Sequence, residues 1–212
     1  MNAILIGIIV ANVLMSYRGF NDLFFFRKYE FHVGSIRAGE QIRMFSSGFL
    51  HADFPHLIFN MLTLYFFAPV VIAYLGNFSF ALIYLGSLIF GSLLTMVLHK
   101  NEYGYRAVGA SGAVTGVLYS AILLQPDMML GIFFIIPIPA YLFGILYLLY
   151  SIYGMKAKND NIGHTAHFGG AVGGYLITLI IQPTLFVNNT LMVVLLAIPI
   201  LILLAMEKMG KL

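Results

Sequence analysis

The sequence contains no cysteine and little charge. None of its 212 residues is Cys, and Asp, Glu, Lys and Arg together make up 9% of it. Without cysteine there is no disulfide framework, no thiolate metal site and no thiol nucleophile. An ordinary soluble domain carries about 25% charged residues, so a chain this poor in charge needs lipid around its surface.

The small net positive charge argues against a nucleic acid partner. Eleven Lys and Arg residues against eight Asp and Glu residues give a net charge of +3. These residues are scattered along polar connections, so we expect no nucleic acid partner. What the chain has instead is apolar: 61% of its residues are hydrophobic, and the mean hydropathy is +0.95. The composition predicts an all-α, polytopic transmembrane helix bundle in a lipid bilayer.

Apolar segments recur along the whole chain. A hydrocarbon core about 30 Å thick needs roughly 20 apolar residues per helix, and this criterion predicts seven spans. They lie near 4–15, 57–75, 80–98, 110–124, 129–150, 166–181 and 191–206. A long polar loop is expected at 17–53. Because nothing divides a soluble part from a membrane part, we expect a single membrane domain over 1–212.

Two of these segments have alternative interpretations. The first could be a cleaved signal peptide, but it lacks a basic start and an obvious cleavage site of small residues, which favours a retained helix. The fifth contains Pro137 and Pro139. Within a helix both would free backbone carbonyls, so the sequence predicts a bent span there.

Polar residues gather at the starts of alternate spans. Successive spans cross the membrane in opposite directions, so the starts of the second, fourth and sixth spans lie on one side. They carry His56 and Asn60, then Ser111, then His167. Polar residues within a membrane are costly and mark functional sites by default. The order of the spans therefore predicts that these four side chains converge.

Ser111 is the candidate nucleophile. A serine in a membrane helix often serves only to pack against a neighbour, but Gly109 and Gly112 flank this one where a helix is expected to begin. Small neighbours expose the hydroxyl, and a helix N-terminus offers N–H groups and a positive dipole. An alcohol needs a base to remove its proton, and His167 is the natural candidate.

Glycines predict close approach of the fourth and sixth spans. The fourth carries Gly112 and Gly116, and the sixth carries a double pair of small residues; the four are Gly169, Gly170, Gly173 and Gly174. Helices with such spacing pack unusually closely. We expect that contact to bring Ser111 within hydrogen-bonding reach of His167, although glycine packing beside an incidental histidine is the alternative.

Acidic residues are missing from every predicted span. This favours a Ser-His dyad over a triad, and it argues against zinc proteases with carboxylate ligands and against aspartyl proteases. We expect no metal and no cofactor. His56 and Asn60 are four residues apart and share one helix face, so both can donate hydrogen bonds to an oxyanion.

Together these motifs resemble the signature of the rhomboid family of intramembrane serine proteases. That signature combines His-x4-His-x3-Asn, Gly-x-Ser-Gly and Ala-His-x-x-Gly on alternate core helices. The matching residues here are His51, His56 and Asn60, then Gly109, Ser111 and Gly112, then Ala166, His167 and Gly170. The resemblance spans about 4–181 and implies a six-helix core, a partly embedded first loop and one added C-terminal helix at about 191–206.

The resemblance also implies roles for the site residues. Ser111 would be the nucleophile and His167 the base, with His56, Asn60 and the Ser111 N–H forming an oxyanion hole. Glycines would pack the helices at the site; they are Gly109, Gly112, Gly116, Gly170 and Gly174. Two positions depart from the family: Ile42 stands where a Trp is common, and Thr115 where an aromatic is common, which leaves open what packs beneath the histidine ring.

The implied function is an intramembrane serine endopeptidase that cleaves transmembrane proteins. The alternatives are an inactive relative that only binds membrane proteins, a transporter or channel, and a metal site formed by the four histidines; they are His51, His56, His164 and His167. We expect a bacterial cytoplasmic membrane. Every Lys and Arg falls on the side of the site, which the positive-inside rule places in the cytoplasm, whereas many bacterial rhomboids have the opposite orientation.

Overall fold

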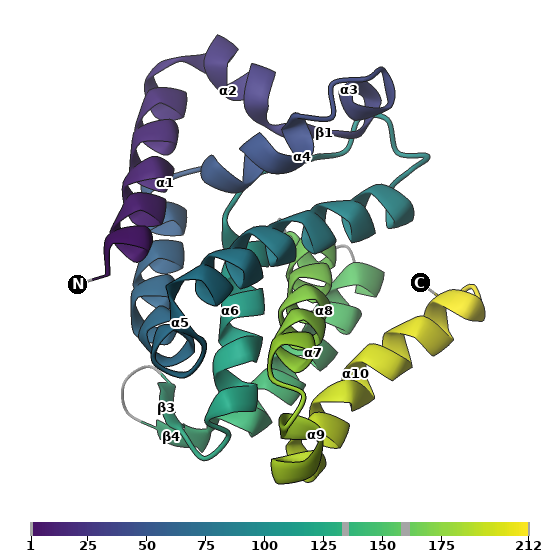
Figure 1. Ribbon diagram of the computed structural model, residues 1–212. Coiled ribbons are helices and arrows are strands. Elements are labelled where there is room, and N and C mark those ends of the chain that lie inside the picture. The colour runs from purple at the N-terminus through teal and green to yellow at the C-terminus, as the bar shows by residue number, and fades with distance from the viewer. Residues whose placement is uncertain (1, 133–135, 158–161, 212) are drawn as a thin grey trace.

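Helices form the framework of the computed structural model, which describes residues 2–132, 136–157 and 162–211. The six long helices form a bundle (Figure 1). They are α1 Ala3–Asn21, α5 Phe54–Leu98, α6 Ser111–Leu124, α7 Ala140–Ala157, α8 His164–Ile181 and α10 Thr190–Lys208. The short elements are α2 Leu23–Tyr29, β1 Phe31–His32, α3 Val33–Arg37, α4 Arg43–Ser46, η1 Ser47–Phe49, β2 Arg106–Ala107, β3 Met129–Ile132, β4 Ile136–Pro139 and α9 Leu185–Asn188.

Four of these helices, α1, α5, α7 and α10, are long and apolar enough to cross a membrane. Large apolar side chains on the outside of the bundle are widely exposed: Phe78 is 80% exposed, Ile180 77% and Phe59 74%. A soluble surface does not carry so much exposed apolar area. The fold is therefore an all-helical membrane bundle, which confirms the predicted fold class.

The helix α5 contains two of the predicted spans. At Gly76 the backbone has φ 81° and ψ 173°, which breaks the helix into two parts, 54–75 and 77–98. Glycine adopts this conformation without the steric cost that a side chain would add. The first part runs beside α1, and the second crosses the bundle to pack on α6 and α8 (Figure 1). The predicted division at Gly76 is confirmed.

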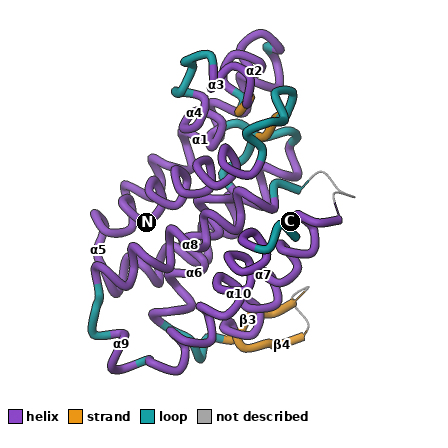
Figure 2. The backbone as a smooth tube through the Cα atoms, turned by 90° about the vertical axis from the view of Figure 1, so that its right-hand side faces the viewer, coloured by secondary structure: helices purple, strands orange, loops and turns teal. Residues whose placement is uncertain are grey.

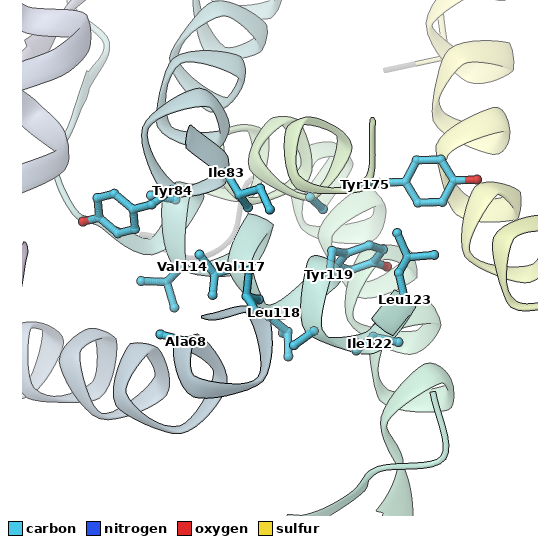
Figure 3. Close-up of a cluster of buried hydrophobic side chains, with 14 of the residues drawn as sticks. Ala68, Ile83, Tyr84, Val114, Val117, Leu118, Tyr119, Ile122, Leu123 and Tyr175 are labelled. Carbon is cyan, nitrogen blue, oxygen red and sulfur yellow. The ribbon is translucent and has the colours of Figure 1, made fainter. Parts of the chain in front are cut away.

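The short helix α6 lies in the middle of the bundle. All its residues after Ser111 are buried, and α5 and α8 pack against it. Figure 3 shows side chains of α6, among them Val114, Val117 and Leu118, pointing into the cluster that fills the core. Fourteen residues make a helix about 21 Å long, shorter than the hydrocarbon core of about 30 Å. At least one end of α6 therefore lies within the depth of the membrane.

The predicted helix at 129–150 is wrong in its first half. The chain forms an antiparallel hairpin, β3 with β4, and α7 begins only at Ala140. The Ala140 N–H donates to the Met128 carbonyl (2.8 Å). Because strand residues alternate in direction, the N–H of Ile138, two residues earlier, also points toward β3. Pro137 and Pro139 fall at the positions that need no N–H for the ladder, which is where a strand tolerates proline.

The predicted polar loop at 17–53 is also largely helical. The last turn of α1, the short helices α2, α3 and α4, and the turn η1 form a cap at one end of the bundle (Figure 1). Figure 2 shows this cap at the end opposite β3, β4 and α9. Arg43, only 7% exposed, donates to the carbonyls of Arg27 (2.6 Å) and Glu30 (3.2 Å). Pairing of β1 with β2 then joins the cap to the segment that leads into α6.

Candidate active site

Ser111 is the first residue of α6. The residue before it, Ala110, makes no side-chain cap hydrogen bond. The N–H groups in the first turn of α6 are therefore not occupied by a capping side chain. Ser111 is half-buried, and it adjoins a cavity of about 40 Å³. Ser47, Ser92 and Thr95 are the other hydroxyl-bearing residues among a mainly apolar lining. The volume is large enough for a water molecule, which hydrolysis requires.

Gly109 brings His56 and Ser111 to the same place. Its φ is +131°, a conformation that other residues rarely adopt. A Cβ at this position would lie 2.8 Å from Cε1 and 2.9 Å from Nε2 of His56, and 3.5 Å from Oγ of Ser111. The Gly109 N–H donates to the Ser47 carbonyl (3.0 Å), which fixes the turn to the cap. The imidazole of His56 and the hydroxyl of Ser111 therefore both adjoin the space that glycine leaves open.

Glycines also set the contact between α6 and α8. A Cβ on Gly112 would lie 2.9 Å from the Ala166 carbonyl oxygen. One and two turns further along α8, a Cβ on Gly170 would overlap the Gly112 carbonyl and one on Gly174 the Gly116 carbonyl. Because Gly112 follows Ser111 and Ala166 precedes His167, this contact brings the backbone next to the serine close to the backbone next to the histidine. The close approach of these two helices agrees with the glycine spacing, and a hydrogen bond between Ser111 and His167 stays a prediction.

The side chain of His167 is held from α7. Its Nδ1 lies 2.8 Å from Oη of Tyr147, and the two rings are stacked with centroids 5.9 Å apart and planes at 22°. Sequence reasoning missed Tyr147, one of 13 tyrosines and part of no motif. The signal that could have found it is Thr115, since a small residue there leaves room for a ring from another helix.

Asn60 is buried at 4% exposure, one turn after His56. Its amide Nδ2 donates to the His56 carbonyl (3.0 Å). The structure thus brings His56 to Ser111 and engages the amide of Asn60 with the backbone of its own helix. A rotation of the Asn60 side chain would be needed before that amide could donate to a substrate.

His51 connects the cap to the start of α6. The ring is fully buried; Nδ1 lies 2.9 Å from Ser16 Oγ, and Nε2 accepts a hydrogen bond from the Ala110 N–H (3.3 Å). Ser16 in turn donates to the Phe49 carbonyl (3.1 Å), so the proton of His51 sits on Nδ1 in this arrangement. Burial, with a smaller contribution from His56, lowers the pKa of His51 to about 3. This neutral ring positions the residue before Ser111.

The four histidines do not form one cluster. The His51 and His56 rings are 5.0 Å apart, and the His164 and His167 rings 6.3 Å apart. Within residues 2–132, 136–157 and 162–211, no three His, Asp or Glu side chains are close enough to hold a metal ion. The predicted alternative of a four-histidine metal site therefore has no support in the described part of the chain.

Comparison with known proteins gives a consistent result. Residues 38–184 match the Rhomboid domain family. The chain is 34% identical over 147 residues to putative rhomboid protease YdcA of Bacillus subtilis, covering 68% of this chain and 69% of that protein. It is 29% identical over 185 residues to the mitochondrial RHOMBOID-like protein 12 of Arabidopsis thaliana, covering 79% of this chain and 55% of that protein.

The mitochondrial Rhomboid protein 1 of Saccharomyces cerevisiae is 30% identical over 141 residues, which cover 64% of this chain and 40% of that protein. The chain thus matches about half the length of the plant and yeast proteins. The family match includes the turn at Gly109, the start of α6 and the start of α8. The candidate site residues Ser111, His167, His56 and Asn60 therefore all lie in the region that matches the family.

Proposed function

The chain belongs to the rhomboid family, and from this premise we propose that it is an intramembrane serine endopeptidase that cleaves transmembrane proteins. The family includes proteins named as proteases, and the chain is an integral membrane protein. The observation that carries the proposal is the close contact of Gly112 with Ala166. It places the immediate neighbours of these two residues, Ser111 and His167, at the point where α6 and α8 meet.

Acyl transfer at this site would proceed in two halves. His167 Nε2 accepts the proton as Ser111 Oγ attacks the carbonyl carbon of the scissile peptide bond. The oxyanion that forms accepts hydrogen bonds from the first N–H groups of α6 and from the His56 side chain, with Asn60 as a further donor after rotation. His167 then gives its proton to the leaving amine, and the carbon–nitrogen bond breaks. Water from the cavity beside Ser111 hydrolyses the acyl-enzyme in the second half.

The depth of the site determines the kind of substrate. Ser111 opens a helix too short to cross the hydrocarbon core, and we place this end of α6 at membrane depth, where a peptide bond must reach the serine in extended form. A transmembrane helix already satisfies its own backbone hydrogen bonds. Substrates should therefore carry small or helix-breaking residues near the cut. We place this activity in one membrane domain over 1–212 and, in keeping with the Bacillus relatives, in a bacterial cytoplasmic membrane.

Cleavage of a single-span substrate in liposomes tests the proposal. Wild-type protein is compared with Ser111→Ala and His167→Ala, with and without a metal chelator. Both variants should lose activity by several orders of magnitude, and the chelator should have no effect. Ser79→Ala on α5 and His99→Ala directly after it, which remove the same side-chain types away from the site, serve as matched controls and should cleave normally.

The outcomes separate the proposed protease from its rivals. Cleavage that persists in Ser111→Ala contradicts the serine mechanism. Well-folded wild-type protein that cleaves none of a panel of helix-destabilised substrates would instead favour a relative that binds membrane proteins without cutting them.

A further inference from the structure

We propose that Tyr147 is a positioning residue of this site, and that its phenol, itself oriented by Thr115, holds the His167 imidazole with the proton on Nδ1. This inference rests on the proposed function, because a base that deprotonates Ser111 through Nε2 must carry its own proton on Nδ1. It goes beyond the predicted dyad of Ser111 and His167, since it adds an uncharged third residue, Tyr147, from a different helix.

The contacts form a path that leads from Ser111 through Thr115 and Tyr147 to His167. Tyr147 Oη lies 2.8 Å from His167 Nδ1. Thr115 Oγ1 lies 3.5 Å from the same phenol oxygen, and it donates to the Ser111 carbonyl (2.7 Å). Three helices are joined in this way, because His167 is on α8, Tyr147 on α7, and both Thr115 and Ser111 on α6.

One direction of donation satisfies every contact along this path. The Ser111 carbonyl can only accept, so the Thr115 hydroxyl spends its proton there. Thr115 Oγ1 is then left to accept from the Tyr147 O–H. With its own proton committed, Tyr147 Oη accepts from His167 Nδ1. The network therefore favours the Nδ1–H tautomer, in which Nε2 carries the lone pair that accepts the proton of Ser111.

The ring of Tyr147 also fills the place left by a departure from the family pattern. At the position four residues after the serine, where an aromatic is common, this chain has Thr115, which is buried. The Tyr147 ring stacks on His167 instead. A bulky aromatic at 115 would compete with Tyr147 for this space, so the small residue on α6 and the tyrosine on α7 belong together.

Two further ring contacts near His167 differ in kind from that of Tyr147. His164, one turn earlier on α8, meets the His167 ring edge-on with centroids 6.3 Å apart, and Tyr150 of α7 lies against His164. Neither contact is a stacked arrangement with a hydroxyl at Nδ1. Tyr147 thus combines ring stacking with a hydrogen bond to the nitrogen that decides the tautomer.

Kinetics of conservative variants provide the first test. Tyr147→Phe keeps the ring and removes the hydroxyl, so kcat should fall roughly 10-fold while KM stays unchanged, because the lost bond does not touch substrate. Thr115→Val should lower kcat by about 3-fold, and Thr115→Ser, which keeps the hydroxyl, should restore it. The double variant Tyr147→Phe/Thr115→Val should be no slower than Tyr147→Phe, since Thr115 acts through Tyr147.

The matched control is Tyr153→Phe, a substitution on the same helix at a ring that is 60% exposed, and it should cleave like wild type. A wild-type kcat in Tyr147→Phe would overturn the inference. So would a double variant in which the two effects multiply, because that result would make the two hydroxyls independent.

A measurement that needs no activity separates this inference from the proposed function. In Ser111→Ala protein with 15N-labelled histidine, the NMR shifts of His167 should report a proton on Nδ1. Adding Tyr147→Phe should move both ring nitrogens toward the averaged shifts of a tautomer mixture, and Tyr153→Phe should not. Unchanged shifts in Tyr147→Phe would reject the tautomer control even if the protein proves to be a protease. If wild-type protein fails to cleave, the proposed function fails, and the tautomer control is judged by these shifts alone.

Discussion

At the scale of single residues, glycines decide how closely the helices of the site approach. Gly112 and Gly116 of α6 face Gly170 and Gly174 of α8 with backbone against backbone. In lipid, helix association depends on such packing, because burying apolar side chains gains little when the solvent is itself apolar. The position of Ser111 relative to His167 therefore depends on residues that take no part in the chemistry.

A methyl group at this contact should separate the helices. Gly170→Ala would place a Cβ on the Gly112 carbonyl, a backbone atom that cannot move aside cheaply. Overpacking of this kind costs about 1–3 kcal/mol, so we expect a lower unfolding temperature together with weaker cleavage. Circular dichroism is the suitable readout, because the chain has neither tryptophan nor cysteine for fluorescence methods.

Gly7→Ala is the matched control for Gly170→Ala. Gly7 is also helical, in α1, but a Cβ there would meet nothing within 4 Å. Alanine favours a helix over glycine, so this variant should be as stable as wild type or slightly more stable. Equal unfolding temperatures for the two variants would contradict the view that close α6–α8 contact determines the geometry of the site.

At the scale of elements, the sequence predicted what depends on hydropathy and on the order of spans. The helices α6, α8 and α10 begin and end close to the predicted limits, and Gly76 divides the long α5 as expected. The convergence of His56 with Ser111 followed from counting the spans. These features are readable because each depends on local composition or on the alternation of direction across a membrane.

The failures share a physical cause. A hydropathy window cannot tell an apolar hairpin from an apolar helix, so β3 and β4 were included in a span even though Pro137 and Pro139 signalled a break. Tyr147 was missed for a different reason, because its role depends on the rotation of α7 about its axis. That rotation is set by packing with α8 and α10, and no local pattern in the sequence encodes it.

The buried ring of His51 joins three elements and should make stability depend on pH. The pKa of His51 is about 3 in the folded chain and about 6.5 when unfolded. Between these values the unfolded chain binds a proton that the folded chain does not, so stability is complete above pH 6.5 and is lost as the pH falls. From pH 7 to pH 5 this one group should remove about 2 kcal/mol.

Denaturant unfolding of wild type and His51→Gln at both pH values measures this contribution. The variant should be less stable at pH 7, because the links to Ser16 and Ala110 are weakened, and it should lose less stability on acidification. Groups other than His51 affect both proteins equally and cancel in the comparison. Parallel losses in the two proteins would show that His51 is not the titrating group.

At the scale of the whole molecule, charge and site are found at the same end. This end comprises the cap formed by α2, α3, α4 and η1, the segment leading into α6, and the C-terminal ends of α1, α7 and α10. Within the described ranges, these segments carry every Lys and Arg. The hairpin and α9 form the other end, as Figure 2 shows. Positively charged segments are retained in the cytoplasm during insertion, so this asymmetry predicts that the site end faces the cytoplasm.

The absence of cysteine makes this orientation directly measurable with single introduced thiols. Gly104→Cys lies in the exposed connection before β2, where a side chain meets open space, and Val187→Cys lies in α9 at 81% exposure. On intact cells an impermeant maleimide should label Val187→Cys and leave Gly104→Cys unlabelled until the membrane is opened.

Labelling of both thiols from outside would contradict the bundle, because these positions lie at its opposite ends. The reverse pattern would keep the bundle and show that the fold, with the site at its cap end, overrides the charge rule during insertion. Because Ser111 lies at the Gly104 end of the bundle, the same labelling also reports which side of the membrane the candidate site faces.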